Sequence, residues 1–199
     1  DKKGKVIGVL PQGSPCSPIL TNIVCRNLDR RLSGLAKRFN LSYTRYADDI
    51  TFSSDYNVFQ EGSEFMQEFT KIVAEQKFQI NDKKTRLQKS GQRQEVTGLL
   101  VNKKVNIAKE YYRDLRSLLY IWARYGQEQA YAKFIIRYRA SKTYKPKKNS
   151  MPNMAAVISG KLLYMKMVMG ETSSTYLTLR DKFIALCPEQ KAVLDTNLN

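Results

Sequence analysis

Two adjacent aspartates, Asp48 and Asp49, stand between two short runs of residues that favour β-strands. β-Branched and aromatic residues enrich both runs, 41–45 and 50–53, whereas aspartate is a poor strand residue and a good turn residue. The sequence therefore predicts a tight hairpin with both carboxylates at or beside its tip. Neighbouring carboxylates repel each other unless cations neutralise them, as paired Mg²⁺ ions do in phosphoryl-transfer sites. An isolated Asp-Asp can equally be a plain solvated turn.

Helical and strand patterns surround this hairpin. A loop rich in proline and glycine, 11–18, precedes an amphipathic helix, and glycines and helix-start amides in such a loop can approach a phosphate or simply punctuate the chain. The apolar stripe of that helix recurs every three or four residues: Leu20, Val24, Leu28, Leu32, Leu35 and Phe39. Ser17 is a candidate helix cap. Further along we predict a helix over 63–77, strand, basic turn and strand over 78–87, and a hairpin over 95–107. Strands packed on two helices indicate an α+β fold.

From residue 109 onward the pattern is helical. Helices are predicted over four ranges: 109–125, 127–138, 154–168 and 174–186. Gly126 and Gly170 follow two of them, as glycine commonly does at helix C-termini, and a basic loop containing proline occupies 141–153. The strand signal ends near residue 107. We therefore expect one domain over 1–107 and a second, all-helical domain over 108–199.

The charge of the chain indicates a polyanionic partner. The net charge is +16 and the pI is about 9.8, which is typical of proteins that bind nucleic acid. Residues 108–199 hold 16 basic and 7 acidic side chains. Seven basic residues and no acidic residue lie between Lys133 and Lys148, with aromatic residues among them. Such a run can bind phosphates and stack on unpaired bases, or it can be a solvated face.

Several classes of protein are excluded or disfavoured. The chain has no histidine, so it cannot use histidine as an acid, a base or a zinc ligand. Cys16, Cys25 and Cys187 lack metal-ligand spacing, and reduced thiols in an intracellular protein are expected. No run of about 18 apolar residues is present, so we expect no membrane partner.

Four segments, taken in order, resemble consecutive motifs of reverse transcriptases. They are Gln12-Gly13-Ser14-Pro15, Tyr46-Ala47-Asp48-Asp49, the turn at Lys84-Thr85 and the hairpin Val96-Thr97-Gly98-Leu99-Leu100. More narrowly, the stretches 43–53, 96–98, 157–162 and 167–170 resemble retron reverse transcriptases. The resemblance spans nearly the whole chain. It implies the C-terminal part of a polymerase palm, an antiparallel sheet packed on two helices with the primer-grip hairpin, over 1–107, followed by an all-helical thumb over 108–199.

The resemblance also implies a role for each matching residue. Asp48 and Asp49 would be catalytic metal ligands, and Lys84 would be a catalytic group near the leaving pyrophosphate. The nucleotide and its template base would lie against Gln12, Gly13, Ser14, Pro15, Tyr46 and Ala47. The primer grip would be Val96, Thr97, Gly98, Leu99 and Leu100. The residues expected to bind RNA are Arg137, Arg139, Lys142, Tyr144, Lys145, Lys147, Lys148 and Lys161.

The implied activity is RNA-directed DNA synthesis in the bacterial cytoplasm by two-metal nucleotidyl transfer. Its partners would be a structured noncoding RNA, the complementary DNA, deoxynucleotide triphosphates and a retron effector protein of an antiphage defence system. Two Mg²⁺ ions would be shared with an aspartate outside this chain, because only Asp1 precedes the Gln12 loop and it lacks an apolar strand context. The fingers are also missing, so we expect this chain to be part of a longer enzyme or to be completed by a second chain.

The sequence leaves two alternatives open and disfavours a third. A group II intron-type reverse transcriptase would share the same motifs. A non-catalytic RNA-binding scaffold descended from a polymerase would not need the adjacent carboxylates. A basic structural protein would not explain the order of the motifs.

Overall fold

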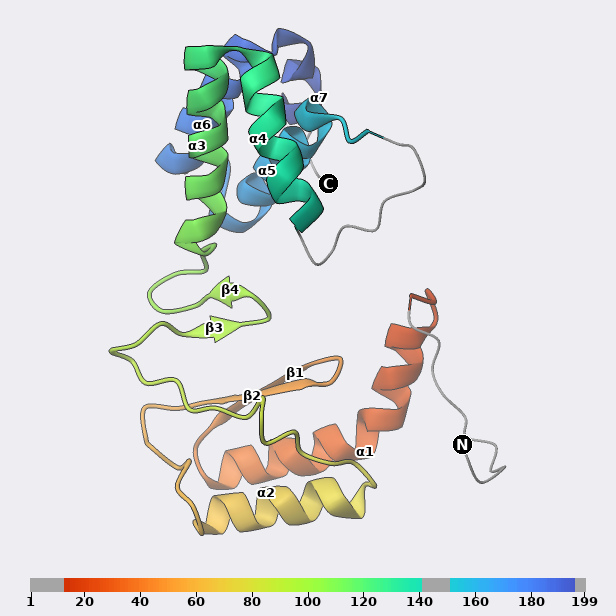
Figure 1. Cartoon of the computed structure of the whole chain (residues 1–199). Helices are drawn as coiled ribbons and strands as arrows, with labels where there is room; N and C mark the ends of the chain where they lie inside the picture. The colour runs from red at the N-terminus through yellow and green to blue at the C-terminus, as the bar shows by residue number, and fades with distance from the viewer. Residues whose placement is uncertain (1–12, 141–150, 196–199) are drawn as a thin grey trace. The chain divides into compact units, whose positions relative to one another are not determined.

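The structure, a computed structural model, describes residues 13–140 and 151–195 (Figure 1). The chain divides into two compact units, Asp1–Lys89 and Ser90–Asn199. Each unit is helix-rich and contains one two-stranded antiparallel sheet among its described residues. The predicted α+β class is therefore confirmed at this level. Among the described helices, none is long and apolar enough to cross a membrane.

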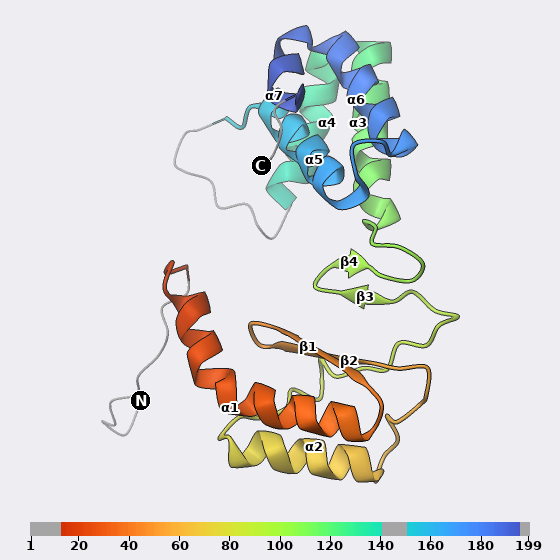
Figure 2. The same ribbon diagram turned by 180° about the vertical axis from the view of Figure 1, so that it is seen from behind.

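The first helix of unit 1, α1 (Ser17–Arg38), has Pro18 in its first turn. Two residues after the helix, Asn40 has a φ of 54°, in the left-handed region. Backbone bonds from Asn40 N to Lys37 O and from Leu41 N to Ala36 O form a Schellman ending. The second half of α1 buries Leu28, Leu32, Leu35 and Ala36. The first turns angle away from α2 (Figure 2).

Two details of the α1 prediction are wrong. The predicted apolar stripe is only partly buried, because Leu20 and Val24 remain 43% and 62% exposed. Periodicity shows that a helix has an apolar face, but not how much of that face its neighbours cover. The N-cap position is Cys16, without a side-chain cap bond, whereas the predicted cap Ser17 lies inside the helix.

The predicted aspartate hairpin is present. Strands β1 (Ser42–Tyr46) and β2 (Asp49–Ser53) pair antiparallel, with Tyr46 opposite Asp49 and a two-residue turn between them. One face of the hairpin packs on α1 and on α2 (Glu64–Glu75). There, the ring centres of Phe52 and Phe65 are 5.1 Å apart. The hydroxyl of Ser63 caps α2 by accepting from the Met66 amide.

The two predicted strands over 78–87 are wrong, although the turn between them is right. A strand needs a neighbouring strand for its backbone groups. The Phe78 amide instead donates to Val73 O and ends α2. The amides of Lys84 and Thr85 both donate to Asn81 O, which forms the turn.

The hairpin predicted over 95–107 folds differently from the prediction. The hairpin is shorter, because β3 (Glu95–Val96) turns back at once into β4 (Leu99–Leu100), within the segment that resembles a hairpin motif. Thr97 and Gly98 both have positive φ, 49° and 85°, as a tight two-residue hairpin turn requires. Of the predicted pairing with residues 105–107, the structure has a single antiparallel bridge, between Leu100 and Asn106.

The rest of unit 2 is a helical bundle. Its helices are α3 (Lys109–Tyr125), α4 (Gln127–Ala140), α5 (Met154–Met169), α6 (Ser174–Leu186), the 3₁₀ helix η1 (Pro188–Gln190) and α7 (Lys191–Asp195). The four long helices match the predicted ranges closely, and Gly126 and Gly170 have the expected positive φ at helix ends. The sequence did not predict the short η1 and α7. The buried core includes Leu119, Trp122, Ile158, Leu162, Tyr176 and Phe183.

The compact units meet at residues 89 and 90, whereas the predicted functional domains meet at 107 and 108. The β3–β4 hairpin groups with the helical bundle because Leu99 packs against the bundle core. The palm and thumb division stays a prediction.

Candidate functional site

The two adjacent carboxylates lie at the tip of the β1–β2 hairpin. Asp48 is the second residue of the turn and Asp49 the first residue of β2, and both are exposed. Neither carboxylate makes a hydrogen bond or ion pair with another residue that the structure describes. Over the described ranges, no group of three or more acidic or cysteine side chains could hold a metal ion. Asp48 and Asp49 are thus two oxygen-donor ligands that need further ligands to complete a metal site.

The turn itself has an unusual backbone. Ala47 has a φ of 52°, in the left-handed region, which costs a residue with a Cβ about 1–2 kcal/mol. Strain of this kind persists only where the surrounding structure maintains it. The contacts of the neighbouring residue Arg45 show what maintains it here.

Arg45 ties the turn to α1. Its side chain is only 7% exposed, and its Nε and Nη2 each donate to one oxygen of Asp29 at 2.7 Å. The remaining nitrogen, Nη1, donates to the carbonyl oxygen of Ala47 at 2.8 Å. Nη2 also donates to Asn22 Oδ1 at 3.1 Å, and the Tyr43 hydroxyl donates to Asp29 Oδ1 at 2.6 Å. We call Asn22, Asp29, Tyr43 and Arg45 the clamp.

The electrostatics of the clamp favour its ionised form. The hydrogen bonds from Arg45 lower the pKa of Asp29, against an opposing effect of burial. The hydrogen bond with Asp29 in turn raises the pKa of Arg45. Burial, followed by the hydrogen bond to Asp29, raises the pKa of Tyr43, which therefore stays a neutral donor. Burial also raises the pKa of the neighbouring Cys25 thiol.

Sequence reasoning did not identify the clamp, although one signal was available. Tyr43 and Arg45 alternate along β1, so both point to the face that packs on the helices. A buried arginine needs a carboxylate partner. The sequence offers several acidic residues and does not say that Asp29, on α1, is the one within reach.

The predicted nucleotide-binding loop lies just before α1. Gly13 has a φ of 85°, and the Ser17 amide donates to Ser14 O, which closes a turn over 14–17 that leads into the helix. Pro15 is exposed, whereas Gln12 lies outside the described residues. Tyr46, at the other predicted nucleotide contact, is 73% exposed beside the turn.

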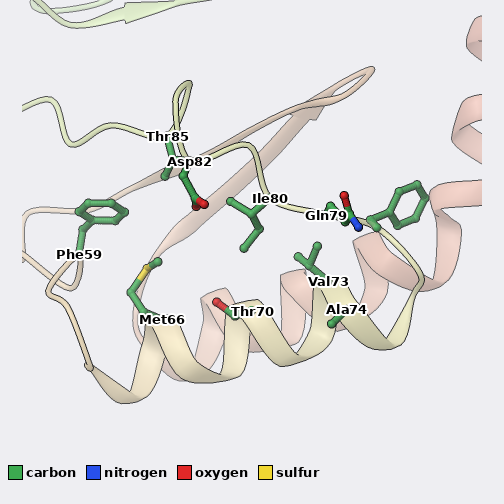
Figure 3. A pocket seen from close by; sticks show the side chains of 10 residues that line it. Phe59, Met66, Thr70, Val73, Ala74, Gln79, Ile80, Asp82 and Thr85 are labelled. Carbon is green, nitrogen blue, oxygen red and sulfur yellow. The ribbon is translucent and has the colours of Figure 1, made fainter.

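Lys84 lies on the exposed turn after α2, in the same unit as the aspartates. Its ammonium group contacts no carboxylate of the described chain. On either side of it, Asp82 and Thr85 point toward a cavity of about 580 Å³ above α2 (Figure 3). Phe59, Met66, Val73 and Ile80 also line this cavity. The structure therefore places Lys84 at the surface without bringing it into contact with Asp48 or Asp49.

The predicted primer-grip residues form the β3–β4 hairpin of unit 2. Thr97 and Gly98 are exposed at its turn, while Val96, Leu99 and Leu100 are half-buried. The hairpin thus belongs to the second compact unit and the aspartates to the first.

The predicted RNA-binding residues divide into three groups. Arg137 and Arg139 are exposed on α4, and Arg137 is 3.0 Å from Asp114 in an exposed ion pair. Lys161 is half-buried, with its Nζ 5.6 Å from the centre of the Tyr111 ring. The remaining residues, Lys142, Tyr144, Lys145, Lys147 and Lys148, lie outside the described residues.

A second basic surface was not identified from the sequence. Arg113, Arg116 and Lys182 line a groove of about 610 Å³ between α3 and α6, with the apolar floor contributed partly by Leu119 and Leu186. Tyr120 lies in the same groove and is 63% exposed. None of the three cations forms an ion pair within 13–140 or 151–195, and no acidic residue lines the groove. Its cations come from two helices far apart in sequence, so no linear charge run reveals it.

Comparison with known proteins gives consistent matches. The family described as reverse transcriptase (RNA-dependent DNA polymerase) matches residues 4–110. The retron Mx65 reverse transcriptase of Myxococcus xanthus is 42% identical over 123 residues, which cover 62% of this chain and 28% of that protein. The retron Ec86 reverse transcriptase of Escherichia coli is 37% identical over 114 residues, which cover 56% of this chain and 35% of that protein. The matched stretch thus spans about a quarter to a third of these relatives. No solved structure gives a significant match.

Proposed function

The chain belongs to the reverse transcriptase (RNA-dependent DNA polymerase) family and is of the retron type, and from this membership we propose that it is the C-terminal palm and thumb of an RNA-directed DNA polymerase. One observation carries the proposal. Within the matched region, two adjacent carboxylates are exposed at a hairpin tip whose strained backbone a buried arginine maintains. A solvated surface turn has no need of such support.

The donor set fits Mg²⁺, since carboxylate oxygens are the ligands that this ion prefers. Asp48 and Asp49 would hold two ions together with an aspartate outside this chain. When bound, the ions would neutralise charge on the reacting phosphate and favour attack by the primer hydroxyl. The residues of this chain supply the ligands and keep them at one place on a rigid hairpin. Mutual repulsion of the two carboxylates favours cation binding there.

The other predicted residues would act around this centre. Gln12, Gly13, Ser14, Pro15, Tyr46 and Ala47 would contact the nucleotide and template. Lys84 would stabilise charge on the leaving pyrophosphate, and its exposed position on a turn is compatible with that role. Val96, Thr97, Gly98, Leu99 and Leu100 would hold the primer end.

We further propose that the helical unit binds the structured RNA of a retron, with Arg137, Arg139, Lys161 and the 142–148 stretch as contacts. The groove of Arg113, Arg116 and Lys182 supports this proposal, because unpaired cations beside an exposed tyrosine suit contacts with a phosphate and a base.

In the complete enzyme, Arg113→Ala with Arg116→Ala should reduce the slope of log RNA affinity against log salt concentration by about 1–2, since two phosphate contacts are lost. Lys191→Ala, a change at an exposed lysine on α7, is the control. An unchanged slope would remove the groove from the RNA interface.

The partners implied by retron relatives remain proposals for this chain. They are the noncoding RNA and its complementary DNA, deoxynucleotide triphosphates, the fingers and N-terminal palm, and a retron effector protein with an antiphage role. The cytoplasmic location stays a prediction. The leading alternative is a non-catalytic RNA-binding scaffold, which is compatible with the absence of a three-residue metal group among the described residues.

One experiment separates the polymerase from the scaffold. Asp48→Asn in the complete enzyme should lower the rate of primer extension by at least about 100-fold, because a metal ligand contributes several kcal/mol to the transition state. RNA affinity and the unfolding midpoint should stay close to wild type, since Asp48 is exposed on a turn. The matched control is Asp55→Asn, which changes another exposed aspartate of the same unit. Extension at the wild-type rate by Asp48→Asn would reject the proposal in favour of the scaffold.

A further inference from the structure

The direction of the Asp48 side chain depends on a single peptide group. The carbonyl of Ala47 belongs to the peptide that joins Ala47 to Asp48, and a peptide group is planar and rigid. Fixing that carbonyl oxygen in space therefore restricts the rotation of the plane from which the Asp48 Cα projects. The turn has only two residues, so β1 and β2 constrain its ends while this plane lies at the unsupported tip.

Arg45 holds that carbonyl through a hydrogen bond. Nη1 is 2.8 Å from Ala47 O, and the other two nitrogens of the guanidinium are committed to Asp29. We propose that Arg45, oriented by Asp29, is a positioning residue that sets the direction of the Asp48 carboxylate; this inference rests on the proposed polymerase function.

The geometry explains why an arginine is present. A guanidinium is planar and carries five N–H donors in a fixed fork, so one edge can bind a carboxylate while the third nitrogen points elsewhere at a defined angle. Asp29 accepts on both oxygens, and Asn22 and Tyr43 bond to the same pair. Because Asn22 and Asp29 both lie on α1, contacts with this helix fix the position of the turn in addition to its own strands.

Asp29 has a second role in this arrangement. A guanidinium beside two exposed carboxylates would pair with them and compete with metal ions for the same oxygens. The bidentate bond to Asp29 satisfies the guanidinium charge on the helix side. Asp49 stands opposite Tyr46 on the other face of the hairpin, away from Arg45. The clamp thus supports the turn while leaving both carboxylates for cations.

The test separates positioning from stability by replacing the ion pair with apolar residues of similar volume. Such replacements of buried ion pairs often preserve stability. Asp29→Leu with Arg45→Met in the complete enzyme should keep an unfolding midpoint near wild type but leave Ala47 O unheld. We expect kcat for single-nucleotide extension to fall about 10–100-fold, the range found when groups that orient metal ligands are removed. The KM for the nucleotide should change less than kcat.

Two further measurements sharpen the test. Mn²⁺ added alone and followed by electron paramagnetic resonance should bind about 10–100-fold more weakly to the double variant, a readout that needs no turnover. Arg45→Lys should also lose activity, because an ammonium cannot bind Asp29 with two parallel bonds and reach Ala47 O at once. The matched control is Arg31→Met with Glu75→Leu, which removes a 2.5 Å ion pair between α1 and α2 that does not touch the turn.

The outcomes are distinguishable. Wild-type kcat and Mn²⁺ affinity in a stable Asp29→Leu, Arg45→Met variant would overturn the positioning role. If that variant does not fold, wild-type activity of Arg45→Lys would overturn it instead. Failure of the polymerase proposal appears separately, as normal extension by Asp48→Asn.

Discussion

The two tight hairpins that the structure describes solve the same backbone problem in different ways. At the β3–β4 turn, Thr97 and Gly98 have φ values of 49° and 85°, and glycine meets half of the requirement without steric cost. At the β1–β2 turn, Ala47 has a φ of 52° and no glycine is present. There, Arg45 bonds to the turn carbonyl and connects it to Asp29 on α1.

The difference follows from what each turn carries. The β3–β4 turn is exposed, and the Thr97 hydroxyl makes a local bond, donating to the adjacent Val96 O. A local solution is sufficient for a turn that presents no metal ligand. The β1–β2 turn carries Asp48, whose side chain is useful only in a defined direction. Tertiary contacts from a helix supply that direction, which glycine freedom cannot do.

The largest effect that distinguishes the turns should come from removing their side-chain support. Arg45→Ala leaves Asp29 partly buried without its cation, and we expect a loss of about 2–3 kcal/mol, below the range for fully buried pairs because Asp29 is a third exposed. Thr97→Ala removes only a local exposed bond and should cost about 0.5 kcal/mol or less. Urea unfolding of both variants measures the contrast. Similar losses would mean that the clamp adds nothing beyond a local turn bond.

A smaller effect should come from exchanging glycine and alanine between the turns, with opposite signs. No atom lies within 4 Å of the position that a Cβ on Gly98 would occupy, so Gly98→Ala should cost about 1–2 kcal/mol through its φ alone. Ala47→Gly relieves the same strain but frees the unfolded chain, so we expect a gain of about 0.5 kcal/mol. The denaturation midpoints of the two variants, compared with wild type, show whether each change raises or lowers the stability. A loss of stability in Ala47→Gly would mean that Ala47 is not strained.

The smallest effect should be a dependence on pH that only the first turn shows. The pKa of Asp29 is lowered from 3.8 in the folded protein, so its stabilising contribution is present above about pH 4 and is lost as pH falls through the folded pKa. Asp29→Asn should therefore be less stable than wild type at pH 7, and the difference should shrink below pH 4. Thr97 and Gly98 carry no titratable group, so Thr97→Ala should differ from wild type equally at both pH values. A pH-independent difference for Asp29→Asn would contradict the ionised clamp.

The elements of the fold could be predicted where local pattern decides. The helix α3 has strong apolar periodicity and glycine follows α3 and α5, and all four long helices of unit 2 agree with the predicted ranges almost to the residue. Strands were predicted less well, because a strand exists only where another strand accepts its bonds. Residues 78–80 have strand-forming composition, yet the Phe78 amide is used to end α2. Residues 95–101 do not form one continuous strand, because the positive φ values of Thr97 and Gly98 reverse the chain there.

In the candidate site, too, local pattern predicts some features and tertiary packing decides others. The adjacent aspartates and their hairpin could be predicted because strand formers flank turn formers within a dozen residues. The groove between α3 and α6 could not, because Arg116 and Lys182 come together only when two helices pack. Likewise, the sequence does not show that Ser159 is buried and donates to Gln190 Oε1 across the bundle at 2.8 Å.

The sequence by itself determined which carboxylates this protein presents, that a turn presents them, and that they occur in a basic chain of the reverse transcriptase family. These properties depend on residue type and short-range order, which determine charge, turn preference and strand pairing of adjacent segments. Only the tertiary structure decided that Asp29 is the partner of Arg45 and that Ala47 is held in the left-handed region. Asp29 and Arg45 are sixteen positions apart in the sequence, and their contact depends on how α1 packs against the hairpin. Packing of distant segments is a property of the whole folded unit, so no local pattern contains it.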